Sequence, residues 1–108
     1  MSLADALDTL ADQRSAEREE VFFRTRCSTA AQRNVPVQIV NISATGFMAR
    51  TEGDFAIGDI VTVKMPVVSE TRATIRWALG GRVGAQFERM IDLTSYLNML
   101  AEMVRGTR

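Results

Sequence analysis

The hexapeptide Asn41-Ile42-Ser43-Ala44-Thr45-Gly46 joins two apolar, strand-like runs and places an amide, a hydroxyl and a glycine at offsets zero, two and five. The Asn41 amide and the Ser43 hydroxyl can bind the polar edge of a ligand, since both donate and accept hydrogen bonds. Gly46 permits a positive φ or a close backbone approach. The same side chains also favour a plain turn by bonding their own backbone. The segment therefore predicts either a ligand site or a self-contained turn.

A second candidate for binding chemistry is the pair Arg14 and Arg18, four residues apart in the polar stretch before the first strand-like run. A guanidinium group can pair with a phosphate, donate two hydrogen bonds to guanine O6 and N7, or stack on a base. Twelve of the thirteen basic residues are arginine, so such a spacing also arises by chance. The alternative is a solvated helix face, with Arg14 near Glu17 and Arg18 near Glu19.

Catalytic chemistry is poorly represented. The chain has no histidine, its acidic residues are scattered, and no glycine-rich phosphate loop precedes a helix. Cys27, the one cysteine, lies on the apolar face of a strand pattern, where a free thiol is usually inert core. We therefore expect no enzymatic activity, no cofactor, no metal and no internal disulfide.

Charge and hydropathy restrict the partners. Thirteen basic and thirteen acidic residues cancel, so no global field favours DNA, RNA or an acidic membrane. The sequence shows no signal peptide and no apolar run long enough to span a bilayer. We expect a cytoplasmic protein without a membrane partner.

Periodicity predicts a mainly β fold in one domain of 108 residues. Period-two patterns and turn residues mark six short strands, at residues 21–27, 35–42, 47–51, 60–65, 71–78 and 83–87. In the fifth strand the alternation assigns Ala73, Ile75 and Trp77 to one face, and Trp77 to the core. Antiparallel strands of this length close into a small barrel, which removes exposed edges.

Helical spacing marks both ends of the chain. Leu3, Leu7 and Leu10 predict a short N-terminal helix, residues 1–12, which a polar connector, residues 13–20, joins to the barrel, residues 21–90. Residues 91–108 predict an amphipathic helix packed across the barrel through a stripe that consists of Leu93, Leu97, Leu100, Ala101 and Val104. Met99 and Met103 lie off that stripe and predict either additional core or a surface for a partner.

In this order the motifs resemble the PilZ-domain family of six-stranded barrels that bind the bacterial second messenger cyclic di-GMP. The family signatures are Arg-x-x-x-Arg before the first strand, matched by Arg14 and Arg18, and Asp/Asn-x-Ser-x-x-Gly after the second, matched by Asn41, Ser43 and Gly46. The closing hairpin IRWALGGRVGAQFE supports the resemblance, which spans residues 13–90. It implies that these five residues bind cyclic di-GMP.

The resemblance implies a receptor domain that changes conformation on binding and signals to a protein partner the sequence does not name. If the first strand begins earlier than residue 21, Glu20 and Arg24 take the places of the two arginines. The domain would then be a degenerate PilZ-type adaptor that binds a protein and no nucleotide. A barrel that binds single-stranded nucleic acid is disfavoured, because aromatic residues make up only 6% of the chain and the net charge is zero.

Overall fold

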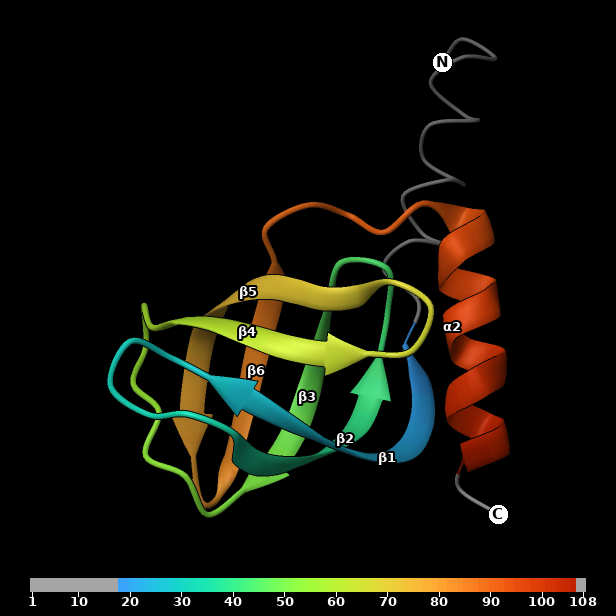
Figure 1. Ribbon diagram of the computed structural model, residues 1–108. Helices are drawn as coiled ribbons and strands as arrows, with labels where there is room; N and C mark the ends of the chain where they lie inside the picture. Colours follow the sequence, from blue (N-terminus) through green and yellow to red (C-terminus); the bar gives the residue numbers. More distant parts are fainter. Residues whose placement is uncertain (1–17, 107–108) are drawn as a thin grey trace, which may run out of the picture.

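The computed structural model describes residues 18–106, which form a closed antiparallel barrel with a helix against one side (Figure 1). The strands are β1 (Glu19–Ser28), β2 (Val35–Ile42), β3 (Gly46–Thr51), β4 (Ile60–Met65), β5 (Ser69–Leu79) and β6 (Arg82–Phe87). Their order around the barrel is β1, β2, β3, β6, β5, β4, and the barrel closes where β4 pairs with β1. The helix α2 (Leu93–Gly106) follows β6 and contacts β1.

The predicted six-stranded antiparallel barrel and its C-terminal helix are confirmed. Strand β1 begins at Glu19, slightly before the predicted residue 21, and β5 extends beyond its predicted range at both ends. The predicted N-terminal helix, residues 1–12, and all of the connector before Arg18 lie outside the described residues.

The barrel interior is filled by the inward residues of the alternating strands. Val61 and Val63 of β4 and Ala73 and Ile75 of β5 are fully or almost fully buried, as the period of two requires. Cys27 is also buried, and this burial raises the pKa of its thiol to about 12. The prediction that Cys27 is unreactive core is consistent with this environment, because the thiolate is the reactive form.

The prediction that Trp77 belongs to the core is wrong. Trp77 is 37% exposed, although Ala73 and Ile75 of the same predicted face are buried. The pairing of β5 with β6 shifts register between Ile75 and Trp77, and an extra residue at such a bulge reverses the direction of the side chains that follow. The indole therefore lies outside the barrel, against Gly84 of β6.

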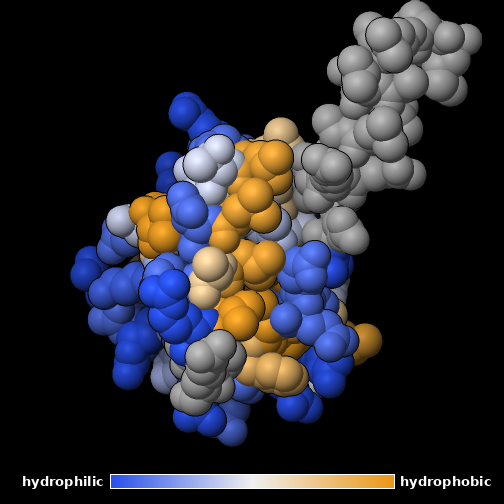
Figure 2. Space-filling model, turned by 90° about the vertical axis from the view of Figure 1, so that its right-hand side faces the viewer, coloured by the Kyte–Doolittle hydropathy of each residue, from blue (hydrophilic) through white to orange (hydrophobic). Residues whose placement is uncertain are grey.

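Helix α2 uses a different face from the one its leucine pattern predicts. It buries Tyr96, Met99 and Met103 in the core cluster, so the two methionines are core rather than partner surface. Leu93, Leu97 and Val104 are 54%, 53% and 49% exposed. Both faces of the helix are apolar, and a hydrophobic pattern alone cannot tell which one meets the barrel. Figure 2 shows the outward apolar side chains gathered on this side of the molecule.

Two local features lie next to the ends of these elements. Asp92 caps α2, because its Oδ2 accepts a hydrogen bond from the backbone N–H of Ser95 at 3.0 Å, and this bond lowers the pKa of the carboxyl group. Between β4 and β5, Val67 has a φ of 69°, a conformation that a β-branched residue adopts only under strain.

Among residues 18–106, no helix is long and apolar enough to cross a membrane.

Candidate functional site

The turn between β2 and β3 is held by its own hydrogen bonds. The backbone N–H of Ser43 donates to the carbonyl oxygen of Gly46 at 2.9 Å. The Ser43 hydroxyl accepts from the backbone N–H of Thr45 at 3.2 Å and lies 3.0 Å from the Thr45 hydroxyl. Ser43 is only 3% exposed. Its local role is therefore to define the shape of the turn, as the self-contained interpretation predicted.

The turn is also tied to the segment that leads into α2. The carbonyl oxygen of Thr45 accepts from the backbone N–H of Phe87 at 2.8 Å, and that of Ala44 from the backbone N–H of Ile91 at 2.9 Å. One residue before the turn, the carbonyl oxygen of Ile42 accepts from the Tyr96 hydroxyl at 3.2 Å. The turn and the helix are thus coupled through hydrogen bonds.

Gly46 is required for packing rather than for a special φ. Its backbone does not have a positive φ, unlike that of Gly58, Gly80 and Gly81. A Cβ at this position would overlap the carbonyl oxygen of Ala85 on β6, so any larger residue would push β3 away from β6. Of the two reasons that the sequence offers for this glycine, close backbone approach is the one that applies.

Arg18 and Asn41 are brought together although they are far apart in the sequence. The Arg18 Nη1 donates a hydrogen bond to the Asn41 Oδ1 at 3.2 Å. Arg18 is exposed and directly precedes β1, and Glu20 lies opposite Asn41 in the β1–β2 ladder. The early start of β1 therefore does not separate Arg18 from the asparagine. Arg14 lies outside the described residues.

Strand pairing extends this site across the outer wall of the barrel. Asn41 pairs with Met48, Met48 with Gly84, and Gly84 with Trp77, so these residues form one row across β2, β3, β6 and β5. We call this set the asparagine row. Because Gly84 has no side chain, the indole occupies the space that a Cβ would fill at this position, and part of its surface is exposed. An exposed aromatic face is a stacking surface for a base.

The sequence comparisons agree with this architecture. A family model for the PilZ domain matches residues 12–106. The chain belongs to the PilZ family. No curated protein is similar enough to the chain to be matched. The suspected family is therefore confirmed over nearly the whole chain, and PilZ domains are in general binding domains rather than enzymes.

The structure places four of the five predicted site residues at one end of the barrel wall. Arg18, Asn41, Ser43 and Gly46 lie where β1 begins and where β2 turns into β3. Trp77 was not predicted to belong to this surface, because no residue pattern reveals the bulge that turns it outward. Its position one residue after an arginine in the closing hairpin is the only available signal, and it is a weak one.

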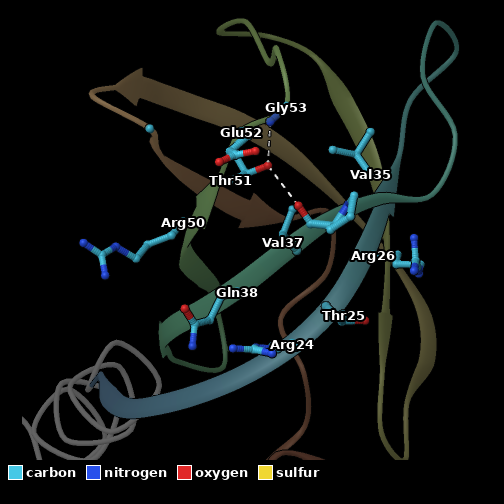
Figure 3. A pocket seen from close by; sticks show the side chains of 12 residues that line it. Arg24, Thr25, Arg26, Val35, Val37, Gln38, Arg50, Thr51, Glu52 and Gly53 are labelled. Carbon is cyan, nitrogen blue, oxygen red and sulfur yellow. Dashed lines mark hydrogen bonds between the residues drawn. The ribbon is translucent and has the colours of Figure 1, made fainter.

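Arg24 and Arg26, the arginines within β1, lie away from the turn. Both line a hollow on the barrel wall, together with Gln38 of β2 and Arg50 of β3 (Figure 3). Arg26 also donates from Nη1 to the carbonyl oxygen of Asn34 at 2.9 Å. Among residues 18–106, no three acidic or cysteine side chains gather in a way that could hold a metal ion.

Proposed function

We propose that this PilZ domain is a receptor for cyclic di-GMP and binds it on the outer wall of the barrel, at the turn between β2 and β3. The observation that carries the proposal is the hydrogen bond from Arg18 to Asn41, which joins the two family signatures at one point. A guanidinium group next to an amide suits a ligand that presents both phosphate and guanine. Arg14 completes the set as a second phosphate or guanine partner.

Each residue has a role in this proposal that its polar groups or its packing support. Asn41 offers an amide oxygen to the amino group of a guanine, and Arg18 offers its fork to a phosphate or to guanine O6 and N7. The exposed indole of Trp77 provides a face on which a guanine stacks. The Ser43 hydroxyl, which lies 3.0 Å from the Thr45 hydroxyl, can donate its proton to a phosphate oxygen while it still accepts from the Thr45 N–H. Gly46 keeps the turn close to β6.

The signal passes to α2 through the turn. A ligand that pulls on Asn41 and Ser43 acts on Ile42 and Ala44, whose carbonyl oxygens bond Tyr96 and Ile91. In this proposal, binding draws the arginine connector over the ligand and shifts α2, and a protein partner recognises the new position. The domain performs no catalysis, and as the receptor of an intracellular messenger it acts in the cytoplasm.

The runner-up is an adaptor that binds a protein partner and no nucleotide. It is favoured by an exposed apolar groove on α2 that is lined by Leu97, Leu100, Ala101 and Val104 together with Arg105 (Figure 2). An apolar helix face of this kind suits an amphipathic helix of a partner protein. In the receptor this helix face binds the protein partner after the ligand has bound, whereas in the adaptor it would be the only binding surface.

Titration separates these functions. Trp77 is the chain's one tryptophan, so its fluorescence reports binding at the asparagine row without a label. Cyclic di-GMP, GMP and a short single-stranded oligonucleotide are compared by fluorescence and by calorimetry. We expect only cyclic di-GMP to bind tightly.

A matched pair of variants then locates the site. Arg18→Ala should weaken binding about ten- to a hundredfold, since a charge-assisted hydrogen bond contributes about 1.5–3 kcal/mol. Arg72→Ala, at another exposed arginine, should leave the affinity unchanged, because Arg72 pairs with Thr62 of β4, forms an ion pair with Glu88 and is not part of the asparagine row. Absence of cyclic di-GMP binding in the unmodified protein would refute the receptor and favour the adaptor.

A further inference from the structure

A second row of polar side chains crosses the barrel wall beside the asparagine row. Arg24 pairs with Gln38, Gln38 with Arg50, and Arg50 with Arg82, so the row runs across β1, β2, β3 and β6. The three arginines are exposed and Gln38 is half-buried. We call these residues the arginine row.

Three residues of the arginine row, Arg24, Gln38 and Arg50, line a hollow of about 720 Å³. Pockets that bind small ligands typically have volumes of about 300–1,000 Å³, and this hollow falls within that range. Figure 3 shows Arg24, Gln38 and Arg50 extending to the same side of their strands. The backbone around Thr51 is fixed, because the Thr51 hydroxyl donates to the carbonyl oxygen of Pro36 at 3.1 Å and accepts from the N–H of Gly53 at 2.9 Å. Hydrogen bonds therefore hold the backbone on one side of the hollow, and arginine side chains lie at its border.

The charges of this row are not balanced within the described part of the chain. Arg50 and Arg82 lie directly opposite each other, and like charges in that position destabilise a sheet. Among residues 18–106, neither they nor Arg24 form an ion pair with a carboxylate, and Glu52 is the only one of these residues that is acidic and lines the hollow. An anion placed between these guanidinium groups would remove the repulsion and gain charge-assisted hydrogen bonds.

We propose that the arginine row is a second subsite, which binds a phosphate diester of a guanine nucleotide next to the first site. On β3 the two rows are two residues apart, Met48 and Arg50, which corresponds to about 7 Å along a strand. A dinucleotide held at Asn41 can span that separation. The same chemistry serves the far half of one cyclic di-GMP or a second molecule stacked on the first. The inference rests on the proposed function for the identity of this ligand.

The test compares Arg50→Ala and Arg82→Ala with Arg72→Ala in calorimetric titrations with cyclic di-GMP. We expect each row variant to weaken binding at least tenfold and the Arg72 variant to change it less than twofold. Arg50→Lys should retain more affinity than Arg50→Ala but less than the unmodified protein, since an ammonium group cannot form a bidentate hydrogen bond. A stoichiometry of one in the unmodified protein would assign the row to the far half of one ligand. A stoichiometry of two that falls to one in Arg50→Ala would assign it to a second molecule.

A second measurement keeps this inference separate from the proposed function. Side-chain Nε–H signals of Arg50 and Arg82 are followed by NMR while inorganic pyrophosphate is added. If cyclic di-GMP binds and the Arg50, Arg82 and Arg72 variants behave alike, the subsite is refuted and the receptor stands. If cyclic di-GMP does not bind but pyrophosphate shifts both signals, the receptor is refuted and the anion subsite stands. If neither ligand has an effect, both proposals are refuted.

Discussion

The buried hydroxyl of Ser43 offers the sharpest test of how the turn is built. Ser43→Ala removes the acceptor of the Thr45 backbone N–H and the neighbour of the Thr45 hydroxyl, at a position that is 3% exposed. A buried donor left without a partner costs about 1–3 kcal/mol. For a domain of this size, 1 kcal/mol shifts the thermal midpoint by about 4–8 °C. We therefore expect the midpoint to fall by at least several degrees.

Asn41→Ala is the matched control for this substitution. The Asn41 amide is only half-buried, and its side chain bonds an exposed arginine rather than the turn. Its removal should cost less than about 0.5 kcal/mol, as exposed polar substitutions usually do. Urea unfolding followed by Trp77 fluorescence gives the free energy of unfolding of both variants, and calorimetry gives their affinity for cyclic di-GMP.

The two measurements together decide the role of each side chain. We expect Ser43→Ala to lose both stability and affinity, and Asn41→Ala to lose affinity alone. If the free energy of unfolding of Ser43→Ala lies within about 0.5 kcal/mol of that of the unmodified protein, the turn does not depend on the hydroxyl. The structural role assigned to Ser43 would then be wrong.

Three further predictions concern the barrel itself. Gly46→Ala should lower the free energy of unfolding by about 1–3 kcal/mol in urea titrations, because its Cβ overlaps the Ala85 carbonyl oxygen; an unchanged stability would mean that β3 and β6 separate freely. Val67→Gly should raise the thermal midpoint, since it releases about 1–3 kcal/mol of backbone strain at a φ of 69° and loses less than that in chain entropy; a lower midpoint would contradict the strain. The unfolded thiol of Cys27 ionises near its ordinary pKa of 9.0, whereas the folded thiol has a pKa of about 12, so the unfolded state releases its proton first and stability should fall above pH 9. The free energy of unfolding should decrease by up to about 1.4 kcal/mol per pH unit, and this decrease should be missing in Cys27→Ala. Equal slopes in the two proteins would show that folding does not raise the pKa of the thiol.

The sequence determined the elements that depend on local patterns. Period-two alternation predicts the strands because neighbouring side chains of a strand point to opposite faces, and short turns between such strands leave few topologies besides a closed barrel. The motif residues were also readable, since an amide, a hydroxyl and a glycine at fixed offsets are visible without coordinates.

Only the tertiary structure decided which surfaces these elements present. The bulge after Ile75 turns Trp77 outward, and a single inserted residue leaves no trace in the hydropathy pattern. Helix α2 has two apolar faces, and the shape of the barrel selects Met99 and Met103, because unbranched thioether side chains fill irregular gaps. The arginine row exists only through the register of β1, β2, β3 and β6, which places side chains side by side that are far apart along the chain.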